Sequence, residues 1–285
     1  MILYYALGGG LGHLTRGRRV LEALDLTRDA AFVTSSPYAA DVRITGGIPV
    51  IAVPDSLARD RDAHRAWLLE VVRDADRLIV DAFPCGIQGE LHELDMPMDL
   101  VARRLRWSEY RRVTDVPLPR FDTVWCVEAL EHEQEQELRM HSARMEPLEL
   151  CVTEMVAHES GESYWLVVHS GPDDEVRELV AYTTELRRLA DVEPDRVFVA
   201  TRCAMTLPDG FERIDAVPVA SLFPAAARII SAAGFNVMLE TRPWREKHHV
   251  LPFARAFDDQ YYRAAARETP HPPSDEGSVS ATYPF

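Results

Sequence analysis

The fold of this chain is decided by residues 228–264, RIISAAGFNVMLETRPWREKHHVLPFARAFDDQYYRA. The apolar run at 228–231 predicts a short buried strand. Gly234 then allows a tight turn at which the backbone can come close to a ligand. A helix is expected to begin near Val237, and residues 250–253 predict the next strand. This alternation of strands and helices predicts an α/β fold with parallel sheets.

The same stretch places polar groups at helix ends. A strand-to-helix turn offers backbone N–H groups and the positive end of a helix dipole, which favour a phosphate. Glu240, Asp258 and Asp259 add carboxylates and Gln260 adds an amide, the groups that hold sugar hydroxyls. Taken alone, each segment is better explained by polar caps on an ordinary crossover between parallel strands.

The two segments occur in the order and at the spacing of the donor-binding half of GT-B glycosyltransferases. The chain most resembles glycosyltransferase family 28, whose best-known member adds N-acetylglucosamine to the lipid-linked peptidoglycan precursor. The resemblance is carried by SAAGFNVMLE (231–240) and FDDQYYRA (257–264). It implies that Glu240 holds the nucleotide ribose and that Asp259 and Gln260 contact the donor sugar. The turn would hold the diphosphate through Ala233, Gly234, Phe235 and Asn236.

The N-terminus predicts the opening of a doubly wound domain. Residues 2–7 (ILYYAL) predict a strand, and the glycine-rich segment GGGLGHLTR (8–16) leads into a helix. No acidic residue follows the second predicted strand at 31–34, which disfavours a nicotinamide or flavin enzyme. His13 at the mouth of the loop can accept a proton near neutral pH, or it can simply pack at a helix start. The loop resembles the first glycine loop of the same family, with Leu11 in place of a glycine, and this resemblance implies that Gly10 and Gly12 bind the donor.

A second resemblance keeps another activity open. The pattern of Gly10, Gly12, His13 and Arg16 is also similar to that of a short GT-B-fold sugar-nucleotide hydrolase of pseudaminic acid synthesis, in which the histidine helps to activate water. A third possibility is a relative that binds a nucleotide sugar or a partner without catalysis. It is suggested by the SGP segment (170–172), where the family has a glycine-rich phosphate loop, because proline donates no N–H.

The resemblance extends to further positions. It implies that Ser170 and Gly171 lie at the donor phosphates and that Val217 lies beside the nucleobase. Asp81, at the end of a predicted strand, and Arg16 are candidates for the acceptor side. The implied reaction is inverting transfer from a nucleotide diphosphate-sugar, with a UDP-sugar favoured, to an unknown acceptor, without a metal or cofactor.

Composition limits the function classes. The 285 residues suggest about two domains. The net charge of −15, from 31 basic and 46 acidic residues, argues against general nucleic-acid binding. Four scattered cysteines indicate reduced thiols, and neither a signal peptide nor an apolar run of about 20 residues is evident. We therefore expect a cytoplasmic protein.

The domain organisation follows from these elements. We expect an N-terminal Rossmann-like acceptor domain at 1–160, a C-terminal Rossmann-like donor domain at 161–270 and a flexible tail at 271–285, with the two parallel sheets facing a cleft. The polar segment 158–163 is the predicted linker. Because a proline-rich tail replaces the helix that ends the relatives, the domains are expected to be loosely held or to be completed in a homodimer.

Two charged stretches leave alternatives. Arginines crowd residues 103–120, which predicts either a solvated helix face or a patch for an anionic acceptor or the inner face of a membrane. The D-x-D triplet at 60–62 matches a metal-binding pattern, but its charged helical context favours solvated surface.

Overall fold

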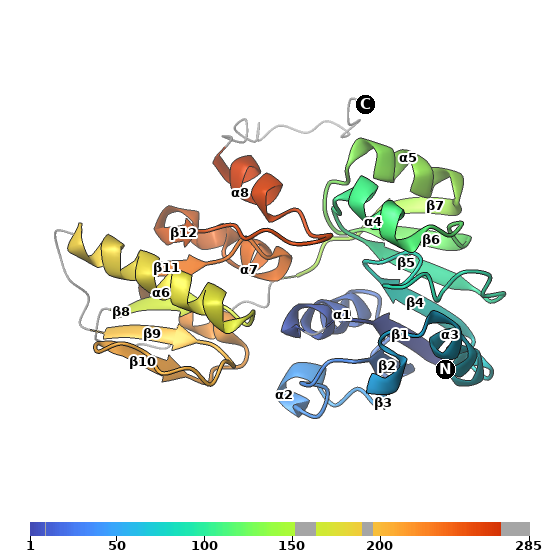
Figure 1. The fold of residues 1–285 in the computed structure, drawn as a ribbon, viewed down its shortest axis with the longest axis horizontal. Coiled ribbons are helices and arrows are strands. Elements are labelled where there is room, and N and C mark those ends of the chain that lie inside the picture. Colours follow the sequence, from blue (N-terminus) through green and yellow to red (C-terminus); the bar gives the residue numbers. More distant parts are fainter. Residues whose placement is uncertain (9, 152–163, 190–195, 269–285) are drawn as a thin grey trace.

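A computed structural model describes residues 1–8, 10–151, 164–189 and 196–268. It contains two sheets in which every pair of neighbouring strands is parallel (Figure 1). The first sheet has the order β3-β2-β1-β4-β5-β6-β7, and the second has the order β10-β9-β8-β11-β12. Both are the doubly wound arrangement of a Rossmann-like unit, with helices on both faces. The predicted α/β class with two parallel sheets is confirmed.

The first sheet and its helices run from residue 2 to residue 147. The strands are β1 (Ile2–Ala6), β2 (Ala30–Thr34), β3 (Val50–Ala52), β4 (Arg77–Asp81), β5 (Met98–Ala102), β6 (Phe121–Cys126) and β7 (Ser142–Pro147). The helices are α1 (Leu11–Ala23), α2 (Val42–Thr45), α3 (Arg61–Val72), α4 (Trp107–Thr114) and α5 (His132–Met140).

The second sheet begins at residue 164. Its strands are β8 (Tyr164–Val168), β9 (Arg196–Ala200), β10 (Phe211–Ile214), β11 (Ala226–Ser231) and β12 (His248–Val250), and its helices are α6 (Asp173–Arg188), α7 (Phe235–Glu240) and α8 (Gln260–Glu268). The strand expected at 250–253 lies earlier, at 248–250. A 3₁₀ turn at Val219–Leu222 precedes β11.

The two domains share apolar packing. Phe235 and Leu239 of α7 lie in the same buried cluster as Tyr4, Leu14 and Phe32 of the first domain. Figure 1 shows α7 facing α1 across the junction. An interdomain surface that continues a hydrophobic core holds domains in a fixed relation. The expectation of a loosely held pair is therefore wrong.

A chain segment also ties the domains together. After β12, residues 251–259 cross to the first domain, where Leu105 forms a β-bridge with Asp258 and the Arg106 N–H donates to the Phe257 carbonyl at 2.8 Å. Three predicted patch arginines lie at this crossing. Arg103 pairs with Asp258, Arg104 with Asp259, and Arg106 donates to the carbonyl of Arg255. Arg103 and Arg104 are largely buried at the domain interface, whereas Arg106 stays exposed at its edge.

Other predictions have no structural test. The linker at 158–163 and the tail at 271–285 lie outside the described residues. None of the helices in the described ranges is long and apolar enough to cross a bilayer.

Candidate functional site

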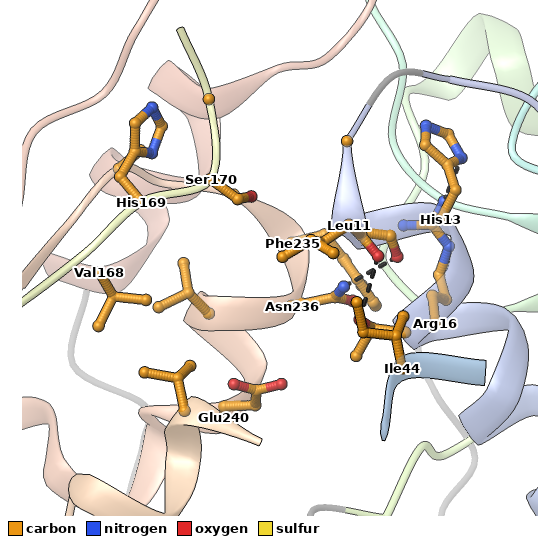
Figure 2. Close-up of a pocket in the computed structure, with 18 of the residues that line it drawn as sticks. Leu11, His13, Arg16, Ile44, Val168, His169, Ser170, Phe235, Asn236 and Glu240 are labelled. Atoms are coloured by element: carbon orange, nitrogen blue, oxygen red, sulfur yellow. Dashed lines mark hydrogen bonds between the residues drawn. The ribbon is translucent and has the colours of Figure 1, made fainter. Parts of the chain in front are cut away.

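A cavity of about 960 Å³ lies between the two domains (Figure 2). Its walls are built mainly by loops at the carboxyl ends of strands, which is where parallel sheets bind ligands. The first domain contributes the loop after β1 and one side of α1. The second contributes the loops after β8, β9 and β11, and residues 255–258 of the crossing segment complete the wall.

His13 and Asp81 form a hydrogen-bonded pair at this wall. The His13 Nδ1 lies 2.5 Å from Asp81 Oδ2. Arg16 donates from Nε to Asp81 Oδ1 at 2.8 Å, and the Tyr4 hydroxyl donates to the same oxygen at 2.9 Å. The pairing follows from the fold, because Asp81 ends β4, β1 lies next to β4, and His13 lies in the first turn of the helix that follows β1. Asp81 itself is fully buried behind the histidine.

The electrostatics of the pair favour a neutral imidazole. Burial lowers the pKa of His13, and Asp81 opposes this only in part. Burial alone would raise the pKa of Asp81, but Arg16 and His13 outweigh it and hold that pKa well below its usual range. An ionised Asp81 accepts from Nδ1–H, which leaves a lone pair on Nε2. The arrangement can therefore take a proton from a group that reaches Nε2.

The backbone around the pair is specialised. Gly8 has φ +135°, and a Cβ there would lie 2.6 Å from the ring of His13. A side chain at this position would displace the imidazole. Ala82, directly after Asp81, is in the left-handed region at φ 67°. This turn brings Phe83 to the cavity, with its ring centroid 5.7 Å from that of His13.

Glu240 lines the cavity, as its predicted role requires. Its carboxylate pairs across the domain junction with Arg19 of α1, and both side chains are largely buried. Burial raises the pKa of Glu240, while Arg19 acts in the opposite direction.

Of the predicted sugar-binding pair, Asp259 and Gln260, only Gln260 lies at the cavity. Gln260 lines the cavity, but its Oε1 accepts from the Phe253 N–H at 3.0 Å. Asp259 is not among the lining residues. It accepts from Arg104 Nε and from the Tyr262 N–H, each at 3.1 Å, and so caps α8. Its neighbour Asp258 lines the cavity in its place.

The predicted phosphate turn meets the glycine loop. Gly234 precedes α7, and Asn236 Nδ2 donates to the Gly12 carbonyl at 2.9 Å. The cavity is lined here by Gly10, Gly12, Gly234, Phe235 and Asn236. Ala233 is fully buried, and its carbonyl accepts from Arg263. On the opposite side, Ser170, Gly171 and Val217 line the cavity.

Sequence reasoning missed a second histidine, His169, which Figure 2 shows on the wall opposite His13. Its Nε2 lies 2.7 Å from Glu175 Oε2, and Glu175 also pairs with Arg255. The spacing of His169 and Glu175 around the SGP segment was the available signal. Glu175, with Asp173 and Asp174, fills the first turn of α6 with carboxylates. Carboxylates at that end of a helix disfavour a phosphate there.

The charge of the cavity differs from that of the chain. Seven arginines line it against four carboxylates, an excess of three positive charges, although the whole chain carries −15. The arginines are Arg16, Arg18, Arg19, Arg43, Arg103, Arg202 and Arg255, and the carboxylates are Glu22, Asp215, Glu240 and Asp258. Asp81, Glu175 and Asp41 pair with Arg16, Arg255, Arg43 and Arg202 from just outside this lining. An anionic ligand would therefore compete with these carboxylates for the guanidinium groups.

Metal ligands do not gather in the part of the chain that the structure describes, where no three His, Cys, Asp or Glu side chains could together hold an ion. In the D-x-D triplet, Asp60 instead caps α3 by accepting from the Ala63 N–H at 3.0 Å.

Comparison with known proteins defines the fold. No protein-family model and no curated protein matches the chain. Among solved structures, spinosyn rhamnosyltransferase SpnG matches with TM-score 0.60 and 14% identity, over 93% of this chain and 84% of that one. The glycosyltransferase SnogD from Streptomyces nogalater matches with TM-score 0.56 and 14% identity, over 90% and 82%.

A third match is the glycosyltransferase SsfS6 from Streptomyces sp. SF2575 in complex with thymidine diphosphate, with TM-score 0.54, 14% identity and coverage of 93% and 84%. Identities this low establish the arrangement of the chain alone. The closer likeness to family 28 stays a prediction. The protein has the GT-B fold that it shares with these glycosyltransferases.

Proposed function

We propose that this protein transfers a sugar from a nucleoside diphosphate donor to a hydroxyl group of an acceptor, with inversion at the anomeric carbon. The observation that carries the proposal is the His13–Asp81 pair at the wall of an interdomain cavity. A neutral histidine oriented by a buried carboxylate is the arrangement that a general base requires.

In the proposed reaction, His13 Nε2 removes the proton of the acceptor hydroxyl. The hydroxyl oxygen forms a bond to the anomeric carbon while the bond from that carbon to the diphosphate oxygen breaks. The proton stays on the imidazole, and the nucleoside diphosphate departs with the electron pair. Asp81 stabilises the imidazolium that forms and does not itself take the proton.

The charges of the cavity support a diphosphate leaving group. Arg18, Arg19, Arg43 and Arg202 lie on its walls and can offset the charge that develops on the departing oxygen. The proline in the SGP segment donates no N–H, and the carboxylates in the first turn of α6 disfavour a phosphate there. The loop after β8 is therefore a poor site for the diphosphate. We therefore assign the diphosphate to these arginines and to the glycine loop before α1. The helix α1 has no side-chain cap and no acidic residue in its first turn, so its N-terminus can face an anion.

The nucleotide would lie towards Glu240 and Val217. Both residues line the cavity. In this proposal Glu240 accepts hydrogen bonds from ribose hydroxyls, and the base contacts the backbone at Val217. SpnG and SsfS6 have both been solved with thymidine diphosphate, so TDP-sugars join UDP-sugars as candidate donors.

The test is a screen of UDP- and TDP-sugars by calorimetry, followed by mass spectrometry of the products with and without hydroxyl acceptors. We expect nucleoside diphosphate to be released only when an acceptor is present. Free sugar formed in water alone would favour the hydrolase, and binding without turnover would favour a non-catalytic relative. Absence of binding by every donor would contradict the proposal.

A further inference from the structure

Arg103 stands beside the reacting groups. It follows the last residue of β5, and β5 pairs with β4 so that Val101 lies opposite Asp81. The carboxyl edge of the sheet thus brings Arg103 next to the His13–Asp81 pair. Its guanidinium lies over the ring of Phe83 at 6.0 Å from the centroid. The residue lines the cavity, yet only 7% of its side chain is exposed.

The positive charge of Arg103 is incompletely matched. Among the described residues its side chain has one hydrogen-bond partner, Asp258, which accepts from Nη1. Arg263 donates to the same Asp258 oxygen at 2.6 Å, so the carboxylate is shared between two arginines. The Nε of Arg103 is buried and lacks a partner within the described part of the chain.

The neighbouring arginines are better matched. Arg16 donates two hydrogen bonds to Asp81. Arg263 donates twice to Glu128, in addition to its bond to Asp258. Burial lowers the pKa of Arg103, and Arg16 and Arg263 lower it further against the opposite effect of Asp258. A buried cation without its full complement of acceptors is stabilised by an anionic ligand.

We propose that Arg103 binds a carboxylate of the substrate beside the acceptor hydroxyl. The inference rests on the proposed transfer reaction and specifies one of its substrates as an acid. The carboxylate belongs either to the transferred sugar, as in a uronic acid, or to the acceptor. Arg103 is then a specificity-determining residue, whereas the diphosphate binds to the arginines further along the cavity.

The first arm of the test addresses the donor. Glucuronic acid and glucose are compared as the sugar on the nucleoside diphosphate that binds most tightly, because these sugars differ only in the carboxylate at C6. Calorimetry should show that the wild-type protein prefers the acid by about tenfold or more, as expected for a charged hydrogen bond. Arg103→Gln should abolish that preference and leave the affinity for the free nucleoside diphosphate unchanged.

The second arm addresses the acceptor. Binding of 4-hydroxyphenylacetate and of its methyl ester is compared on protein saturated with the nucleoside diphosphate. A preference for the acid in this arm alone, lost in Arg103→Gln, assigns the carboxylate to the acceptor. A preference in the donor arm alone assigns it to the sugar.

Matched variants separate ligand binding from domain packing. Arg104→Gln removes a comparable interdomain pair, with Asp259, at a residue that does not line the cavity, so it should keep the preference. Asp258→Asn removes the competing carboxylate and should strengthen the preference. Equal losses in Arg103→Gln and Arg104→Gln would overturn the inference and leave Arg103 as an interface residue.

Two further results bear on the inference. If the affinities for each acid and for its uncharged counterpart agree within about twofold in both arms, the role of Arg103 is wrong, while the transfer reaction still stands. Failure of every nucleoside diphosphate to bind would instead remove the proposed function on which it rests.

Discussion

The imidazole of His13 is held by a carboxylate that lies 68 residues further along the chain. The sequence indicated each residue separately, His13 from its glycine loop and Asp81 from the end of a strand. Their pairing required knowledge that β1 and β4 are neighbours, which is a long-range property of the sheet. Arg19 and Arg255 carried no local signal, because an arginine on a helix or in a loop is usually solvated.

Replacement of the proposed base tests the chemistry at this scale. His13→Gln should lower kcat by about 10²–10⁴-fold, the usual contribution of a general base. Nucleotide affinity in calorimetry should change little, since the substitution leaves the arginines in place. Full turnover by the variant would show that another group accepts the proton.

The pH dependence of the proposed reaction of the wild-type protein provides a second check on His13. Because burial lowers the pKa of His13 below its ordinary value of about 6.5, the imidazole stays neutral through neutral pH. The rate constant kcat/KM should therefore fall on the acidic side with an apparent pKa below 6.5. A decline that begins above pH 7 would contradict this assignment.

Glu240 can be tested by its effect on nucleotide binding. Glu240→Gln should weaken the binding of UDP or TDP by about 1–3 kcal/mol in calorimetry, through the loss of a charged acceptor for ribose hydroxyls. Glu22→Gln is the matched control. Glu22 also lines the cavity, but it forms a surface pair with Arg18. Equal effects of the two substitutions would indicate a general charge effect and no specific contact.

At the scale of elements, two turns that both contain glycine are expected to respond in opposite ways. A Cβ on Gly171 would lie 2.4 Å from His169 Nε2, whereas a Cβ on Gly234 would meet nothing closer than Val237 at 3.9 Å. Gly171→Ala should destabilise the protein by about 1–3 kcal/mol, because it breaks the bond between His169 and Glu175. Gly234→Ala should be neutral or stabilising by up to about 1 kcal/mol. Urea unfolding of both variants gives the comparison.

The elements that the sequence predicted well are those with uninterrupted apolar runs, such as β1, β2 and β11. Two strands were missed for physical reasons. β5 contains Asp99, whose buried carboxylate is matched by Arg77 at 2.7 Å. β7 is an edge strand with exposed polar residues, so it has no buried pattern. β12 begins with His248 and His249, which are tolerated inside because His248 bonds to Ser231 at 2.8 Å.

For the whole molecule, the histidines predict acid sensitivity. Burial is the largest cause of a lowered pKa at each of five histidines: His13, His64, His169, His248 and His249. For His248 the pKa falls to about 3. The unfolded chain, with histidine pKa near 6.5, therefore binds more protons than the folded chain as the pH falls. The free energy of unfolding should be constant above about pH 7 and should decrease below pH 6.5.

Urea titrations at several values between pH 7.5 and pH 5 measure this decrease. His248→Gln should make it smaller, since the side chain no longer titrates. His132→Gln, at an exposed position, should leave it as in the wild type. A free energy of unfolding that does not change with pH over this range would contradict the burial of these side chains.

The packing of Phe235 and Leu239 among side chains of the first domain has a thermodynamic consequence. Unfolding of one domain exposes apolar side chains of the other to water. The two domains should therefore unfold together in one cooperative transition. Differential scanning calorimetry should show a single heat-absorption peak instead of two. If a nucleotide binds in the cavity as proposed, it is expected to enter and leave while Phe235 and Leu239 stay packed against the first domain.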